Sequence, residues 1–127
     1  MHYAKKNLRD VEDMAAKNGL SAHQEARFPR IDLGADQNGL NYLIVKPRER
    51  EAFAHRHRTA EEIYVVLSGS GRVKLDDVLV ELAQLDAVRV SPGVTRCFEA
   101  GGDGLEVLVF GRHVEGDVEM VEDFWKS

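Results

Sequence analysis

Apolar and polar residues alternate in short runs along most of the chain after residue 24, and the runs are separated by glycine, proline or paired acidic residues. Alternation places successive side chains on opposite faces of a strand, so each run predicts a β-strand. The predicted strands lie at 28–33, 40–46, 53–57, 62–67, 72–75, 78–82, 87–90, 95–99 and 105–110. Closely spaced short strands with little helix predict an all-β sandwich or barrel.

The N-terminal part of the chain has a different period. Leu8, Val11 and Met14 recur at helical spacing, which predicts a helix over 7–18 that ends at Gly19. We expect this short helix to pack on the sheet.

Turn residues define the connections between the strands. The sequence Asp36-Gln37-Asn38-Gly39 predicts a tight hairpin, and Asp76-Asp77 predicts a second one. Gly69-Ser70-Gly71 and the glycine-rich run 101–104 are expected to end the strands before them. The strand at 40–46 is apolar on both faces, which is compatible either with burial beneath the N-terminal helix or with a homodimer interface.

Length and charge limit the classes of function. The 127 residues predict one domain, divided into an N-terminal helical extension (1–24), a β-barrel (25–111) and an acidic tail (112–127) packed on the barrel or on a partner. A net charge of -5 argues against a nucleic-acid or anionic-membrane partner. The chain has no apolar run of about 20 residues, no signal-peptide pattern and one cysteine, Cys97, so we expect a cytoplasmic protein without an internal disulfide.

The stretch 55–69 gathers residue types that bind metal ions. His55 and His57 are two positions apart in a predicted strand, so their side chains point the same way. The next predicted strand is expected to return alongside the first, with Glu62 at its start. Two imidazole nitrogens and one carboxylate oxygen suit a divalent cation such as zinc, nickel, iron or manganese. The alternative is a pair of solvated histidines beside a loop carboxylate.

The same stretch resembles the first motif of the cupin family, which reads Gly, five residues, His-x-His, three or four residues, Glu, six residues, Gly. His55, His57, Glu62 and Gly69 fit this pattern, and Glu49 replaces the leading glycine. The resemblance implies a cupin-type jelly-roll β-barrel that holds a metal ion inside through three histidines and one glutamate.

The second cupin motif reads Gly, five residues, Pro-x-Gly, two residues, His, and this chain departs from it. Leu85 and Ser91 replace the glycine and proline, Gly93 matches, and Arg96 stands where the family has its histidine ligand. A guanidinium group stays protonated and has no acceptor atom, so Arg96 cannot bind a cation.

Three arrangements remain open at this point. In the first, a metal ion binds to the remaining three ligands and Arg96 holds an anionic substrate beside it. In the second, no metal binds and Arg96 forms an ion pair with Glu62, which would make the protein a small-molecule-binding or structural module. In the third, Cys97 replaces the lost ligand, although alternation places it on the face opposite Arg96.

Alternation also assigns neighbours to the site. If Glu62 faces the interior, so do Tyr64 and Val66, and the same argument places Phe53 and Phe98 inside. These four side chains could line a small-ligand pocket, although we expect Phe53 and Phe98 to be core residues. A buried tyrosine hydroxyl needs a partner, so Tyr64 is a candidate for hydrogen bonding or proton transfer.

The resemblance therefore implies a small metal-binding cupin that binds or transforms a small polar or anionic molecule, with Tyr64 and Arg96 as candidate catalytic residues. If it is an enzyme, it would be a metal-dependent one of the dioxygenase, isomerase or epimerase type, and the fold does not select among these.

Overall fold

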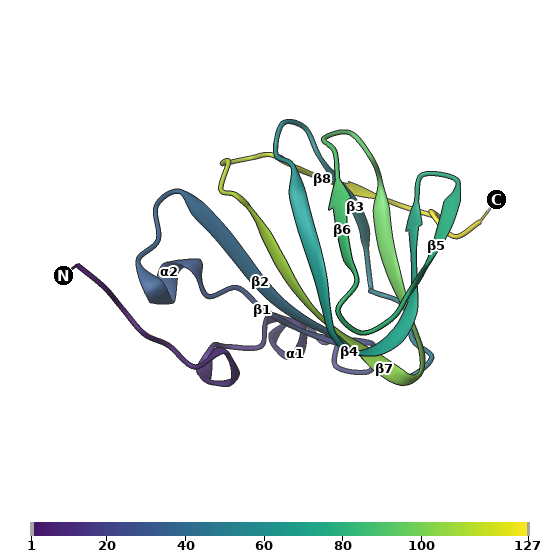
Figure 1. Ribbon diagram of the computed structural model, residues 1–127, viewed down its shortest axis with the longest axis horizontal. Coiled ribbons are helices and arrows are strands. Elements are labelled where there is room, and N and C mark those ends of the chain that lie inside the picture. The colour runs from purple at the N-terminus through teal and green to yellow at the C-terminus, as the bar shows by residue number, and fades with distance from the viewer. Residues whose placement is uncertain (1, 127) are drawn as a thin grey trace.

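The computed structural model describes residues 2–126 and consists mainly of one curled β-sheet of the jelly-roll type (Figure 1). The all-β prediction is therefore confirmed. In the described part of the chain the strands are β1 (Gln24–Arg27), β2 (Asn38–Val45), β3 (Ala54–His57), β4 (Glu62–Leu75), β5 (Val78–Leu82), β6 (Ala87–Val90), β7 (Arg96–Arg112) and β8 (Val118–Val121). The helical elements there are the 3₁₀ turn η1 (Leu8–Asp10), α1 (Met14–Lys17) and α2 (Arg30–Leu33).

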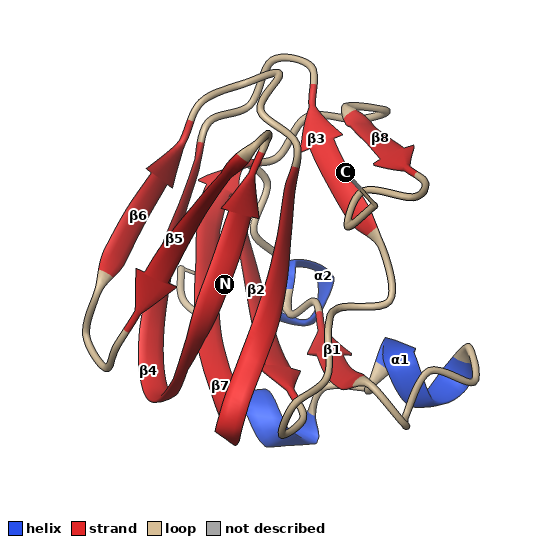
Figure 2. Cartoon of the chain, turned by 90° about the vertical axis from the view of Figure 1, so that its right-hand side faces the viewer, coloured by secondary structure: helices blue, strands red, loops and turns tan. Residues whose placement is uncertain are grey.

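Strand β7 is the centre of the sheet. Its second half pairs antiparallel with β2, and along most of its length it also pairs with β4. Strands β5 and β6 pair with β4, while β3 and β8 extend the sheet from the start of β7. The long strands bend, so β3 and β8 lie across from β2 and the sheet curls around an interior (Figure 2).

The predicted strand ends at 69–71 and 101–104 are wrong, because β4 and β7 run through both glycine-rich stretches. The β4–β7 register shifts there, as in a β-bulge, which bends the pair without ending it. Gly69 has a φ of 81°, and a Cβ atom built on it would lie 2.0 Å from the carbonyl oxygen of Gly104. Only glycine lets the two backbones approach so closely at this bend.

The helix predicted over 7–18 is interrupted and confined to η1 and the single turn α1. The side chain of Asp13 accepts hydrogen bonds from the backbone N–H of Ala15 and from that of Ala26. It therefore caps α1 and ties it to β1, so the backbone at Asp13 is extended rather than helical. The small side chain of Ala15 is buried in the core.

Two further local predictions are wrong. The segment predicted as a strand at 28–33 contains the helical turn α2, and β1 lies before it. Phe28 and Ile31 are 45% and 79% exposed, so these apolar residues do not form the buried face of a strand. The Asn38-Gly39 hairpin is also absent, since Asn38 begins β2 and Gly39 pairs with Gly111 of β7.

The remaining strand predictions agree with the structure. The hairpin around Asp76-Asp77 joins β4 to β5, and the strand at 40–46 corresponds to β2. The core lies inside the curl and is formed mainly by side chains of β2, β4 and β7, among them Leu43, Val45, Tyr64, Val66, Val73, Phe98, Leu105 and Val107. Phe98 is confirmed as a core residue, whereas Phe53 is 53% exposed and is not.

In the described chain, helices are too short to cross a membrane.

Candidate metal centre

His55, His57 and Glu62 meet inside the curl, although their strands are not neighbours. Strand β3 pairs with β7 and β8, so the prediction that the next strand returns alongside it is wrong. Residues 58–61 instead connect the two sides of the sheet, with Arg58, Thr59 and Glu61 exposed, and β4 then starts on the facing side, paired with β6 and β7. The two histidines therefore approach Glu62 from the opposite wall.

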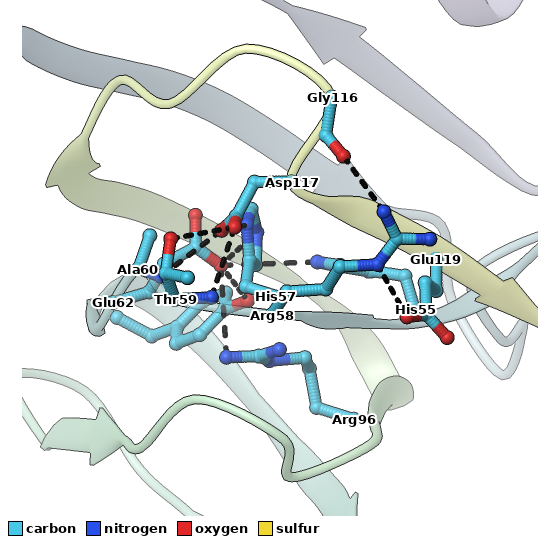
Figure 3. A network of polar contacts seen from close by, with 11 residues as sticks. His55, His57, Arg58, Thr59, Ala60, Glu62, Arg96, Gly116, Asp117 and Glu119 are labelled. Carbon is cyan, nitrogen blue, oxygen red and sulfur yellow. Dashed lines mark hydrogen bonds and ion pairs between the residues drawn. The ribbon is translucent and has the colours of Figure 1, made fainter.

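The three side chains converge on one carboxylate oxygen. Oε1 of Glu62 lies 3.1 Å from Nε2 of His57 and 3.7 Å from Nε2 of His55. One ligand atom from each residue lies within 4.8 Å of the others. Figure 3 shows the three side chains pointing toward one another. The prediction that these residues form one cluster of metal-ligating groups is confirmed.

The second ring nitrogen of His57 is held by Asp117, which follows β7 in the chain and precedes β8. Nδ1 of His57 lies 3.1 Å from Oδ2 of Asp117 (Figure 3). A carboxylate only accepts, so Nδ1 carries a proton and donates a hydrogen bond to Asp117. In the neutral ring Nε2 is then a bare acceptor facing Oε1 of Glu62.

Two acceptors 3.1 Å apart repel each other unless a positive charge lies between them. A proton on Nε2 of His57 can supply that charge, and so can a metal ion bound to both atoms. The donor set, two imidazoles and a carboxylate, fits a divalent cation with positions left for other ligands. The residues present therefore fit the metal that the motif implies.

Asp117 is itself fixed by its surroundings. It accepts hydrogen bonds from the backbone N–H groups of Thr59 and Ala60 and from the Thr59 hydroxyl. Burial alone would raise the pKa of Asp117, but these donors and His57 lower it to about 2. A charged Asp117 thus anchors both His57 and the segment that crosses from β3 to β4.

The pKa shifts at the centre agree with this network. The hydrogen bond to Glu62 raises the pKa of His57. Burial would raise the pKa of Glu62, but contacts from His55, His57 and Tyr64 outweigh it and leave the pKa below its ordinary value. Glu62 is therefore a carboxylate at neutral pH, as a metal ligand must be.

Tyr64 supports Glu62 from the same strand. Its hydroxyl donates a 2.7 Å hydrogen bond to Oε1 of Glu62, and its ring packs against Phe98. Burial raises the pKa of Tyr64 well above its ordinary value, so the hydroxyl keeps its proton. Tyr64 is therefore a hydrogen-bond donor that helps to hold the carboxylate of Glu62 in place.

Arg96 lies beside the cluster and is completely buried. It pairs with His55 across β3 and β7, and Nη2 is 3.9 Å from Oε1 of Glu62. This distance is too long for a hydrogen bond. Its Nε, Nη1 and Nη2 atoms make no hydrogen bond to any residue between 2 and 126. Cys97 is buried with its sulfur near backbone carbonyls of Glu51 and Phe53, so it is not a replacement ligand.

Glu51 is a second carboxylate near the centre, and the prediction that the charged run at 48–51 is solvated loop is wrong for this residue. Its Oε1 accepts a 2.9 Å hydrogen bond from the backbone N–H of Phe98. Burial raises the pKa of Glu51, and the nearby charge of His55 opposes that shift.

Two cavities reach the histidines. One, of about 340 Å³, is lined by both histidines and Glu51. The other, of about 320 Å³, is lined by His57, Glu62 and the segment 111–118. Arg96 and Tyr64 are absent from both linings.

Residues 41–111, which run from within β2 to near the end of β7, match the family described as "Cupin domain". The chain belongs to the cupin family. The match contains all three candidate ligands and Arg96, and the jelly-roll sheet agrees with it.

Solved structures of other cupins share this fold. A cupin protein from Bacteroides fragilis is 20% identical with a TM-score of 0.72, over 91% of this chain and 88% of its own. The polyketide cyclase RemF from Streptomyces resistomycificus is 23% identical with a TM-score of 0.74, over 93% of this chain and 84% of its own. Identities this low support the fold alone.

A more similar sequence comes from Methanocaldococcus jannaschii. An uncharacterized protein of that organism is 27% identical over 115 residues, which cover 88% of this chain and 90% of the relative. The two chains therefore correspond over most of their lengths.

Two residues of the site, Asp117 and Glu51, were not predicted from the sequence. Asp117 lies 60 positions after His57, inside an acidic tail without a motif. Glu51 lies in a run of alternating charges that is typical of a solvated loop. Neither position carries a sequence signal that would distinguish it from its exposed neighbours.

Proposed function

We propose that this cupin binds a divalent metal ion through His55, His57 and Glu62, and that it binds or transforms a small polar or anionic molecule beside that ion. The observation that carries the proposal is the 3.1 Å approach of His57 Nε2 to Glu62 Oε1 while Asp117 occupies Nδ1. A cation bound to both Nε2 of His57 and Oε1 of Glu62 would remove the repulsion between these two acceptor atoms.

The chain's own residues have distinct tasks in this proposal. Asp117 fixes the tautomer and the orientation of His57, and Tyr64 holds Glu62 by its hydrogen bond. Both are positioning residues. A divalent ion bound there would supply Lewis acidity or activate oxygen.

The anion-binding role of Arg96 stays a prediction. Three buried guanidinium nitrogens without a hydrogen-bond partner in the described chain support it, because such groups are costly unless they meet an acceptor. Since Arg96 is fully buried and lines neither cavity, an anion would reach it only after neighbouring side chains move.

Metal content tests the proposal. Protein purified without chelator and then dialysed against zinc, nickel, manganese or ferrous iron is expected to retain about one equivalent of at least one of them. The variants His57→Gln and Glu62→Gln should weaken that binding roughly 100-fold or more, because even the partners of ligands contribute 10- to 100-fold. His23→Gln is the matched control, since the His23 side chain is exposed and, among residues 2–126, pairs with Glu49 away from the centre.

A metal-free role is the second candidate, and the closeness of Arg96 to Glu62 favours it. In that case the ion pair holds the interior together, and the barrel is a small-molecule-binding or structural module. The two candidates differ in the metal measurement: less than a tenth of an equivalent with every metal would support the second and contradict the first.

We also propose that two copies pair through the outer face of β2, β7 and β4. There a hollow of about 710 Å³ is lined by Leu40, Ile63 and Phe110 together with Arg30 and Glu61. A face with both charges and an apolar middle can match its own copy about a two-fold axis. Phe110→Glu should convert the dimer to a monomer in analytical ultracentrifugation, and a wild-type monomer would contradict the pairing.

A further inference from the structure

The cavity of about 340 Å³ that ends at the two histidines has an apolar wall. Four large side chains on it are unusually exposed for their type: Phe28, Phe53, Val118 and Met120 are 45%, 53%, 48% and 65% exposed. They come from the segment after β1, the segment before β3, and β8.

These side chains are not scattered. The strands that carry or directly adjoin them, β1, β3 and β8, lie together with α1 on the right of Figure 2. Buried Leu43 of β2 and both histidines line the same cavity. An exposed apolar cluster around a cavity is typical of a binding site for an apolar group.

The charges on the wall restrict the ligand further. Of the described residues that line the cavity, none is lysine or arginine, and Glu51 is the acidic one. A phosphate or a second carboxylate on the ligand would find no cation along this wall. The metal at the histidines would be the one positive partner for a negative oxygen.

We infer that the ligand of this site is a monoanion with an apolar body: one carboxylate or enolate oxygen bound at the metal, and an aromatic or branched aliphatic group against Phe53 and Met120. This inference rests on the proposed metal site and specifies its substrate class. Among small anionic molecules, the inference favours an amphipathic ligand over a highly charged one such as a dicarboxylate or a sugar phosphate.

Calorimetric titration of the zinc-loaded protein with benzoate, acetate and malonate tests the inference. Benzoate should bind at least about tenfold more tightly than acetate or malonate, since a buried ring contributes more than one methyl group. Phe53→Ala and Met120→Ala should each weaken benzoate binding several-fold and leave zinc affinity unchanged. Leu79→Ala is the control, because Leu79 is an exposed apolar residue on β5, away from the cavity.

The outcomes separate the inference from the proposed function. If zinc binds but acetate or malonate binds as tightly as benzoate, or if both alanine variants bind benzoate like wild type, the inference is overturned and the metal site stands. If zinc does not bind, the metal site fails, and the methyl signal of Met120 in NMR then decides the inference. A shift of that signal with benzoate that Phe53→Ala abolishes supports the apolar site, and no shift overturns it.

Discussion

Nδ1 of His57 and Oδ2 of Asp117 lie 3.1 Å apart, and this contact decides which ring nitrogen of His57 faces Glu62. Asp117 also binds the backbone of residues 59 and 60, so the same carboxylate shapes the crossing segment and orients the ligand. Outer partners of this kind are a general feature of histidine metal sites.

Replacing Asp117 with asparagine should therefore weaken zinc binding about 10- to 100-fold. An amide oxygen is a weaker acceptor for Nδ1, and the N–H₂ group in place of Oδ1 would face two donors, the backbone N–H and the hydroxyl of Thr59. Competition with a chromophoric chelator measures the affinity. Asp103→Asn, on an exposed bend of β7, is the control. Equal zinc affinities in the two variants would show that Asp117 does not position His57.

The metal-free protein should lose stability as the pH rises above neutrality. The pKa of His57 is raised from 6.5 in the folded state, so the stabilisation from its protonated form is complete below pH 6.5 and is lost as the pH rises through the folded value. Thermal unfolding of metal-free protein from pH 6 to pH 9 measures this. The His57→Gln variant should lack that part of the slope, and parallel curves for both proteins would contradict the assignment.

Zinc affinity should change in the opposite direction. A metal ion and a proton compete for Nε2 of His57, so binding strengthens as the pH rises from 6 to 8. An affinity that is constant over this range would mean that His57 is not a ligand.

Arg96→His should increase metal affinity by about tenfold or more. The substitution removes a buried cation 3.9 Å from Glu62 and supplies a neutral nitrogen at the position where the cupin motif has its histidine. Arg96→Gln, which removes the charge without adding a strong ligand, separates the two effects. An unchanged affinity in the histidine variant would show that position 96 does not reach the ion.

The packing of the core leads to a prediction that does not depend on the metal. Phe98 is 1% exposed and packs on Tyr64, so Phe98→Ala should reduce the free energy of unfolding by about 3–5 kcal/mol. Val78→Ala, at a side chain that is 60% exposed, should change it by less than about 0.5 kcal/mol. Denaturant unfolding measures both, and a similar effect of the two substitutions would contradict the described core.

Alternation predicted the strands well where one face is buried and the other is not. Thus 72–75, 78–82 and 87–90 were found from sequence, and the common face of His55 and His57 was found from their spacing. These features depend on residues that are close together in the chain, so a local sequence pattern is enough to predict them.

The errors come from contacts between distant residues. The glycines at 69 and 104 look like strand ends, but they are the point where two long strands approach and bend together. Asp13 breaks the predicted N-terminal helix because it also binds Ala26, and the partner of β3 depends on the path of the crossing segment. Periodicity carries no information about such long-range hydrogen bonds.

The most direct test of the metal site is a crystal structure of protein soaked in zinc, with anomalous diffraction recorded on both sides of the zinc absorption edge. We expect one anomalous peak within about 2.0–2.2 Å of Nε2 of His55, Nε2 of His57 and a carboxylate oxygen of Glu62. No peak there, with Arg96 closed onto Glu62 by direct hydrogen bonds, would contradict the account.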